Sequence, residues 1–188
     1  MKRVCVYCGS SPGARGEYAD AARSLGRALA AQGLELVYGG ADVGLMGVLA
    51  DAALNAGGRV VGVIPESFAD RVSHRGLSEL RVVGTMHERK RTMFDLADAF
   101  VALPGGFGTL EELSELLTWA QIGLHQKPCG LLNVAGYYDT LLRFLDHATA
   151  EGFMKPRHRA MLLVASGAEE LLAQFQGYVP PSADKWEE

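Results

Sequence analysis

The stretch ALPGGFGT (102–109) lies where an apolar run gives way to a helix-forming segment, LEELSELLTWAQ (110–121). The apolar run has the length and bounds of a buried strand, and the segment after it has helical periodicity. Between them lie three glycines, Gly105, Gly106 and Gly108. Glycine lets a ligand approach the backbone closely, and a helix start offers free N–H groups and a partial positive charge. The stretch therefore predicts a strand, an anion-binding turn and a helix.

The same alternation of apolar runs and amphipathic segments continues along the chain. Strands are expected at 3–7, 34–38, 59–64, 80–84, 99–104, 128–134 and 160–165, and a polar loop is expected at 65–79. Helices are expected at 17–32, from the end of the loop 38–47 to about 56, and at 86–98, 109–121 and 137–151, with a short last helix from 168. Short apolar strands between amphipathic helices predict a parallel sheet covered on both faces. We expect one doubly wound α/β domain over 1–178 and a flexible tail over 179–188.

The composition is that of a globular domain and argues against a membrane-spanning, secreted or nucleic-acid-binding protein. The 188 residues are 48% apolar and 21% charged, which is usual for a globular domain. A net charge of -4 argues against non-specific binding to nucleic acid or to anionic lipid. No apolar stretch approaches the roughly 20 residues that span a bilayer, and the N-terminus is too short and polar for a secretory signal. Cys5, Cys8 and Cys129 form no metal-binding set, so we expect reduced thiols, a cytoplasmic protein and no metal.

Two carboxylates follow the glycine turn, and helical geometry separates them. At about 100° per residue, Glu112 falls on the flank of the apolar arc whereas Glu111 points almost opposite. Glu112 is therefore the better candidate for a pocket. Thr109 and Glu112 also fit a capping box at the helix start, and the two roles can coexist. Trp119 falls outside the buried arc, so we expect it either at a subunit contact or beneath a neighbouring loop.

The segment MHERKRTMFDLAD (86–98) places two cations in an unfavourable position. Arg89 and Lys90 share the face of Met93, and they lie near the start of the helix, where its dipole repels positive charge. A bound anion would resolve both conflicts. The alternative is that the long side chains snorkel from the flank of the apolar face. Together with the glycine turn, these cations indicate a phosphorylated sugar as ligand.

Two more loops follow strands with similar chemistry. YGGADVGLMG (38–47) offers Gly39 and Gly40, and CGSSPG (8–13) offers Gly9 and Ser10. The carboxyl ends of parallel strands meet at one edge of a sheet, so all three loops are expected to open there. The glycine pattern is neither the dinucleotide fingerprint nor a Walker loop, so the usual nucleotide-cofactor motifs are missing.

These stretches resemble the LOG (Lonely Guy) family of cytokinin-activating phosphoribohydrolases. PGGFGTLEE (104–112) fits the P-G-G-x-G-T-x-x-E motif, and the other similar stretches are VCVYCGSSPG (4–13), YGGADVGLMG (38–47), MHERK (86–90) and GLLNVAGYYDTLL (130–142). The resemblance implies a Rossmann-like fold, a homodimer and no cofactor. It also implies hydrolysis of the N-glycosidic bond of nucleoside 5′-monophosphates, AMP and N6-modified cytokinin ribotides, to free base and ribose 5-phosphate. Members were often labelled lysine decarboxylases, but no lysine here has a convincing pyridoxal-phosphate setting.

By position, the resemblance implies that Arg89 and Glu112 are the catalytic pair. The expected substrate contacts, from the loops and the resemblance together, are Gly9, Ser10, Gly39, Gly40, Met86, Lys90, Gly105, Gly106, Phe107, Gly108, Thr109, Leu110, Glu111 and Thr118. The chain departs from the family at Ala41 and Phe107, where glycine and tyrosine are common, and a glutamate often found after VIP has no match near Arg71 and Val72. These departures leave base preference open. The alternative function is a carrier or sensor that binds a nucleotide or molybdenum cofactor without cleaving it.

Overall fold

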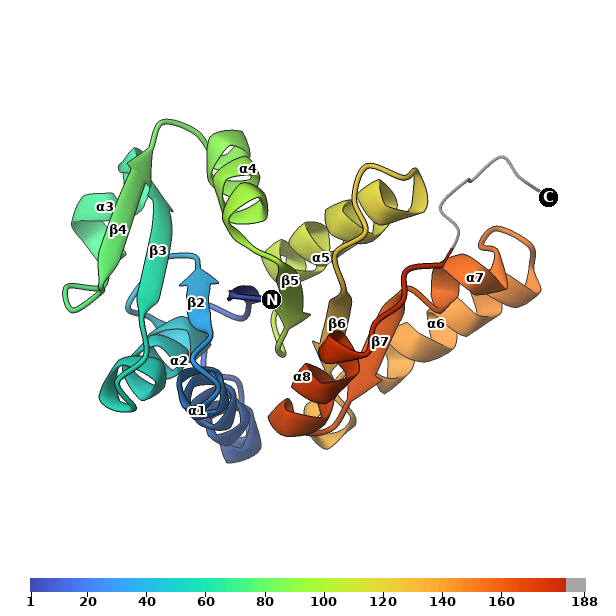
Figure 1. Ribbon diagram of the computed structural model, residues 1–188, viewed down its shortest axis with the longest axis horizontal. Helices are drawn as coiled ribbons and strands as arrows, with labels where there is room; N and C mark the ends of the chain where they lie inside the picture. Colours follow the sequence, from blue (N-terminus) through green and yellow to red (C-terminus); the bar gives the residue numbers. More distant parts are fainter. Residues whose placement is uncertain (182–188) are drawn as a thin grey trace.

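The computed structural model describes residues 1–181 and shows one seven-stranded parallel sheet with helices on both faces (Figure 1). The strands are β1 (Arg3–Tyr7), β2 (Glu35–Tyr38), β3 (Val60–Pro65), β4 (Glu79–Val83), β5 (Ala99–Ala102), β6 (Cys129–Leu132) and β7 (Leu162–Ala165). Their order across the sheet is β4-β3-β2-β1-β5-β6-β7. The predicted doubly wound α/β fold is therefore confirmed. Most of the expected tail, residues 182–188, lies outside the described residues.

Helices lie in the connections between the strands, because parallel neighbours need a crossover connection, and α8 follows the last strand. They are α1 (Gly16–Ala31), α2 (Gly44–Asn55), α3 (Glu66–Val72), α4 (Met86–Leu96), α5 (Phe107–Gln121), a 3-10 turn η1 (Val134–Gly136), α6 (Asp139–Ala150), α7 (Pro156–Arg159) and α8 (Ala168–Gln176). Within residues 1–181, no helix is long and apolar enough to cross a membrane.

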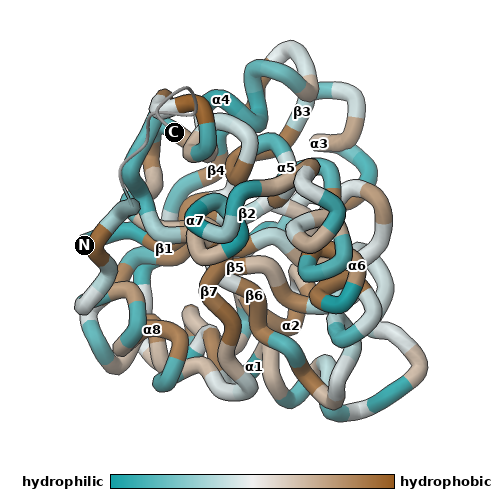
Figure 2. The backbone as a smooth tube through the Cα atoms, turned by 90° about the vertical axis from the view of Figure 1, so that its right-hand side faces the viewer, coloured by the Kyte–Doolittle hydropathy of each residue, from teal (hydrophilic) through white to brown (hydrophobic). Residues whose placement is uncertain are grey.

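The core lies on both faces of the sheet. On one face, the alternate side chains of β1 and β2 pack with α1, α2 and α8, as in the cluster of Val4, Leu25 and Leu49. On the other face, the intervening side chains pack with α4 and α5, as in the cluster of Cys5, Met93 and Phe100, and a further cluster joins β5, β6 and β7 to α5 and α6. Figure 2 shows the hydrophobic strands running through the centre of the molecule. The near-continuous apolar strands of the sequence follow from this two-sided burial.

The polar segment 65–79 was predicted to be a loop, and this prediction is wrong because residues 66–72 form α3. The helix follows Pro65 directly, and none of its residues is buried. A helix without a buried stripe leaves no apolar periodicity in the sequence. Trp119 is partly buried, and its ring packs edge-on against Phe94 of α4 with centroids 5.1 Å apart. The contact is with a helix and not with a loop, and the subunit contact stays a prediction.

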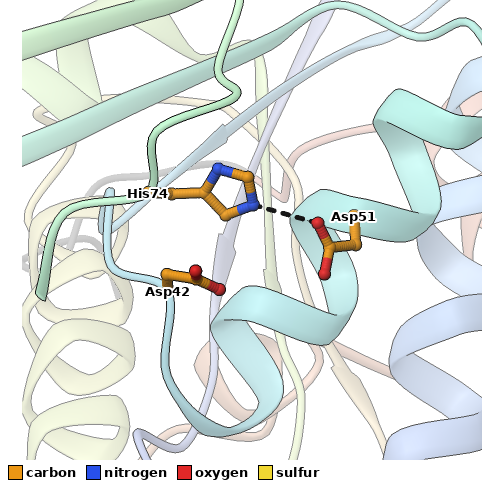
Figure 3. A group of neighbouring side chains, drawn as sticks. All are labelled: Asp42, Asp51 and His74. Atoms are coloured by element: carbon orange, nitrogen blue, oxygen red, sulfur yellow. Dashed lines mark hydrogen bonds and ion pairs between the residues drawn. The ribbon is translucent and has the colours of Figure 1, made fainter.

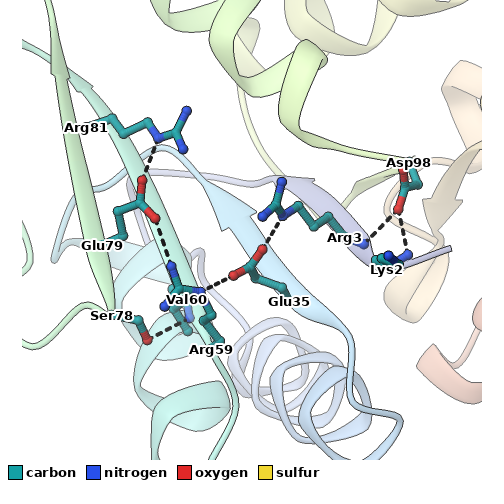
Figure 4. A network of polar contacts seen from close by, with 9 residues as sticks. All are labelled: Lys2, Arg3, Glu35, Arg59, Val60, Ser78, Glu79, Arg81 and Asp98. Atoms are coloured by element: carbon teal, nitrogen blue, oxygen red, sulfur yellow. Dashed lines mark hydrogen bonds and ion pairs between the residues drawn. The ribbon is translucent and has the colours of Figure 1, made fainter.

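An ion-pair network joins four strands at the amino ends of the sheet, the edge opposite the glycine turn (Figure 4). Glu35 on β2 accepts from Arg3 on β1 and from Arg59, which immediately precedes β3. Arg59 also donates to Glu79 of β4 at 2.8 Å, and Glu79 accepts from Arg81 at 2.7 Å. The network thus contributes to the register of the amino-terminal half of the sheet.

The pairing of α1 with α2 depends on a glycine in the middle of α1. A Cβ atom at Gly26 would lie 2.6 Å from the carbonyl oxygen of Leu49 and 2.9 Å from the amide nitrogen of Ala53. Glycine weakens a helix interior by about 1 kcal/mol relative to alanine, so its use here reflects the close backbone contact. At Gly16, the first residue of the same helix, a Cβ would meet nothing within 4 Å.

We expect Gly26→Ala to lower the free energy of unfolding by about 1–3 kcal/mol, because the added methyl group must push two helix backbones apart. Gly16→Ala is the matched control and should leave stability unchanged or raise it slightly. Urea unfolding monitored by circular dichroism measures both. Equal stability of the two variants would contradict this description of the α1–α2 contact.

Candidate functional site

A cavity of about 510 Å³ opens at the carboxyl ends of the strands. It lies where the order of the sheet reverses, because β1 pairs with β2 on one side and with β5 on the other. Ligands of open α/β sheets bind at such a switch point. The loops after β1, β2, β3 and β5 all contribute to its lining.

The loops at the switch point hold one another through their backbones. The N–H of Gly9 donates to the carbonyl of Pro104 at 3.0 Å, and the N–H of Leu45 donates to the carbonyl of Gly9 at 3.1 Å. Gly44 has φ of +55°, and a Cβ there would lie 2.3 Å from the carbonyl carbon of Ser10. The three glycine-containing loops therefore form one packed unit, as the sequence predicts for their shared edge.

The helix after the glycine turn begins at Phe107, two residues earlier than predicted. Gly106 is the N-cap residue and provides no side-chain cap, so the first N–H groups of α5 have no side-chain acceptor there. Thr109 is buried inside the first turn, where its Oγ1 occupies the space beside Gly105. The predicted capping box of Thr109 and Glu112 is therefore wrong. A capping arrangement instead begins α4, where Thr85 accepts from the N–H of Glu88 at 3.1 Å.

Two tyrosines that sequence reasoning missed hold the glycine turn in place. Tyr138 donates its hydroxyl to the carbonyl of Leu103 at 2.7 Å, and Tyr137 donates to the carbonyl of Gly105 at 2.6 Å. Tyr137 and Tyr138 lie between η1 and α6, so this segment holds the backbone at both ends of the turn through the two carbonyl oxygens. The pair of adjacent tyrosines in GLLNVAGYYDTLL was the available signal, although spacing alone does not show which carbonyls they reach.

An ion pair between α4 and α5 lies at the centre of the site. Arg89 Nη1 lies 2.7 Å from Glu112 Oε1, and both side chains are nearly buried, at 13% and 11% exposure. Arg89 Nε also donates to the carbonyl of Val63 at 3.1 Å, which ties the guanidinium to β3. The pair therefore joins elements from both sides of the switch point.

The carboxyl group of Glu112 has a raised pKa. Burial is the main cause, and the charge and hydrogen bond of Arg89 oppose it without cancelling it. A buried carboxylate beside a cavity is typical of a functional site, because folding alone gains little from such a group. The guanidinium in turn needs Gly39, where a Cβ would lie 2.3 Å from Arg89 Nη2.

Comparison with known proteins agrees with the family resemblance of the sequence motifs. A family model described as "Possible lysine decarboxylase" matches residues 46–175. The chain is 52% identical to a probable cytokinin riboside 5′-monophosphate phosphoribohydrolase of Oryza sativa subsp. japonica, over 98% of this chain and 75% of the relative. It is 49% identical to a cytokinin riboside 5′-monophosphate phosphoribohydrolase of Arabidopsis thaliana, over 96% of this chain and 85% of that relative.

The chain belongs to the LOG family. Solved structures that resemble it include a molybdenum cofactor binding protein of Rippkaea orientalis, with a TM-score of 0.72 and 24% identity over 94% of this chain and 97% of that chain. The molybdenum cofactor carrier protein of Chlamydomonas reinhardtii has a TM-score of 0.71 and 21% identity, over 95% of this chain and 99% of that chain. At these identities the likeness shows a common fold.

Most of the LOG-type site residues predicted from the sequence line the cavity. These are Gly9, Ser10, Gly39, Met86, Arg89, Gly106, Phe107, Gly108, Thr109 and Glu112. Gly40, Lys90, Gly105, Leu110, Glu111 and Thr118 are outside its lining. Gly40 and Gly105 neighbour lining residues, whereas Leu110 packs toward α6 and Thr118 lines a separate small cleft between α5 and α6. Their roles as substrate contacts remain predictions.

Lys90 is held outside the cavity by the neighbouring helix. Its Nζ lies 2.5 Å from Glu111 and 3.1 Å from Glu115, both on α5. The structure therefore places Arg89 and Glu112 on the cavity side of the α4–α5 contact, with Lys90 and Glu111 on the other. This corrects the expectation that Arg89 and Lys90 face one ligand together. Among the described residues no lysine lines the cavity, which offers no amine for a Schiff base and does not support the lysine decarboxylase description.

The apolar lining was missed by the sequence analysis. It comprises Ala41, Val43, Met46, Ile64, Pro65, Phe68 and Val72, with the buried Cys8. Burial raises the pKa of the Cys8 thiol, so it is protonated and behaves as an apolar group. Isolated apolar residues in loops give no pattern that separates cavity lining from ordinary core.

We expect Gly105→Ala to lower the free energy of unfolding by about 1–3 kcal/mol, since its Cβ would lie 2.1 Å from Thr109 Oγ1. Gly108→Ala is the control in the same turn. A Cβ there meets nothing within 4 Å and lies in a helix, so the variant should gain up to about 1 kcal/mol. Denaturant unfolding distinguishes them, and a stable Gly105→Ala would contradict the packing of the turn.

Proposed function

We propose that this protein hydrolyses the N-glycosidic bond of nucleoside 5′-monophosphates and releases the free base and ribose 5-phosphate. The observation that carries this proposal is the Arg89–Glu112 pair, nearly buried and facing the cavity beside an uncapped helix start. The names of relatives at about 50% identity support it. The products balance as a hydrolysis, with water adding across the bond between C1′ and the base nitrogen.

The uncapped start of α5 is the proposed site of the 5′-phosphate. Its free N–H groups and the helix dipole favour an anion. Cβ atoms at Gly106 and Gly108 would meet no protein atom within 4 Å, so both glycines leave open space beside the backbone. A phosphate in that space approaches the amides more closely than a side chain would allow. Phe107, between the two glycines, is highly exposed at the mouth of the cavity.

Glu112 is the proposed electrostatic partner of the transition state. Cleavage of the glycosidic bond places positive charge on the ribose ring, as in other glycoside hydrolyses. An ionised carboxylate at this position stabilises that charge or activates the attacking water. Arg89, which the carbonyl of Val63 also holds, orients Glu112 and stabilises the departing base or the phosphate. The pair therefore has complementary roles, with one charge for each end of the breaking bond.

The apolar lining is the proposed site of the base. Ile64, Phe68 and Val72 form a surface suited to a purine and to an apolar N6 substituent. We therefore propose that both AMP and N6-modified cytokinin ribotides bind. The departures at Ala41 and Phe107 both line the cavity, so we propose that they influence base preference.

We also propose a homodimer in the cytoplasm. The resemblance to the LOG family supports the dimer, as do the exposed rings of Phe144 and Phe153 in and after α6. Three buried free thiols, Cys5, Cys8 and Cys129, are consistent with a reducing compartment.

The direct test is to incubate the protein with AMP and with isopentenyladenosine monophosphate and to measure free base by chromatography. We expect hydrolysis, and we expect Glu112→Gln to lower turnover about a hundredfold or more, because one well-placed electrostatic group contributes that much. Glu169→Gln, an exposed carboxylate on α8, is the matched control and should retain full activity. Binding of intact nucleotide without cleavage would instead favour the carrier that the sequence left open.

The pH dependence gives a second prediction. If ionised Glu112 is required, kcat/KM falls as pH drops through its pKa, and that pKa is raised above the ordinary 4.5. The acid limb of the profile should therefore lie above pH 4.5. In Arg89→Ala the residual activity should show a limb at still higher pH, because the group that lowers the pKa is gone. If the acid limb of kcat/KM lies at the same pH in Arg89→Ala as in the wild type, a group other than Glu112 controls the pH dependence.

A further inference from the structure

A segment distant from the ion pair fixes one side of the cavity. This segment, residues 72–76, begins at the last residue of α3 and is here named the strap. Its first residue, Val72, lines the cavity together with Phe68 of α3. Because α3 has no buried residue, packing alone does little to hold these two side chains in place. The position of this wall therefore depends on how the strap is attached.

The strap is attached to the β2–α2 loop by its backbone. The N–H of Asp42 donates to the carbonyl of Val72 at 2.7 Å, and the N–H of His74 donates to the carbonyl of Gly40 at 2.9 Å. Between these bonds, Ala41 and Ser73 form an isolated antiparallel bridge. The same loop supplies Ala41 and Val43 to the cavity, so the strap and the loop form adjacent parts of one wall.

The ring of His74 adds a side-chain attachment to α2 (Figure 3). The ring is buried, at 8% exposure, and both of its nitrogens have partners. Nδ1 accepts from the N–H of Gly76 at 3.0 Å, and Nε2 lies 3.0 Å from Oδ1 of Asp51. Since Nδ1 is an acceptor, the neutral ring carries its proton on Nε2 and donates it to Asp51. His74 thus bonds the strap to α2 and also closes the turn at Gly76.

The same cluster could be read as a cation site. Asp42, Asp51 and His74 each offer one ligand atom, and these atoms lie within 4.8 Å of one another. A metal-bound histidine normally donates its other ring N–H to an acceptor. Here the other nitrogen faces the N–H of Gly76, which is a donor. The hydrogen-bond pattern therefore favours a protein–protein bond over metal ligation.

We propose that His74, through its bond to Asp51, is a positioning residue that sets the affinity of the cavity for the base end of its substrate. The proposal rests on the proposed function, because the substrate is taken to be a nucleoside monophosphate. The bond acts through Val72 and Phe68, and the Arg89–Glu112 pair lies on different elements. Its loss should raise KM and leave kcat nearly unchanged.

Four substitutions separate the two bonds of the ring. Asp51→Ala removes the acceptor, whereas Asp51→Asn keeps an amide oxygen that can accept from Nε2. His74→Asn keeps an acceptor near Gly76 but loses the reach to Asp51, and His74→Gln keeps a donor near Nε2. We expect Asp51→Ala and His74→Asn to raise KM for AMP about tenfold, with kcat within about threefold of wild type. Asp51→Asn and His74→Gln should restore KM to near the wild-type value, and Asn55→Ala on the same helix is the control.

Amide hydrogen exchange tests the proposal without any substrate. The amides of Asp42 and His74 make the bonds between loop and strap, so they should exchange faster in Asp51→Ala and His74→Asn than in Asn55→Ala. Unchanged exchange and unchanged KM in these two variants would overturn the proposal. If the wild-type protein cleaves no nucleotide, the proposed function fails, and the exchange result still decides the role of His74.

A metal-dependent cluster would give a different pattern. Asp51→Asn would then be as damaging as Asp51→Ala, and treatment of the wild-type protein with EDTA would raise KM. That result would overturn the proposal in favour of a cation site. A fall in kcat that parallels a loss of thermal stability would overturn it as well, because it would indicate general unfolding rather than a displaced wall.

Discussion

The contact between Arg89 and Glu112 is the interaction on which the arrangement of the site depends. It joins α4, which packs against β1 to β4, to α5, which packs against β1 and β6, beside the point where strand order reverses. Charges so little exposed gain little from pairing unless their remaining hydrogen-bonding capacity is also used. Arg89 meets part of this requirement through the carbonyl of Val63, and Gly39 leaves the space for its guanidinium. Several elements are thus arranged to keep one carboxylate beside a cavity.

The backbone around this pair is fixed by short contacts that only glycine permits. Gly44 and Gly105 each lie where a Cβ would come within 3 Å of another loop or of a side chain. Gly106 and Gly108 differ, because the space beside them is open. The glycines of the turn therefore divide into those that allow the loops to pack and those that leave room for a ligand.

The fold class and the part of the cavity formed by the glycine loops, Arg89 and Glu112 could be predicted from the sequence, since both depend on local patterns. Apolar strands between amphipathic helices indicate a doubly wound sheet, and loops after parallel strands must share an edge. Helical geometry alone separated Glu112 from Glu111. It did not show that Lys90 would turn to Glu111 and Glu115, because the relative rotation of two helices is a tertiary property. The same limit explains the mistaken capping box, since Thr109 is buried against Gly105 in place of capping α5.

The proposed roles of Glu112 and of the helix start require a defined position of the phosphate and the sugar relative to Glu112. A crystal structure of the Glu112→Gln variant with intact AMP measures this directly. We expect the phosphate within hydrogen-bond distance of the backbone amides of residues 107–109, with C1′ facing the side chain at position 112 and the base against Phe68 and Val72. A phosphate bound elsewhere, or a ribose turned away from position 112, would contradict it.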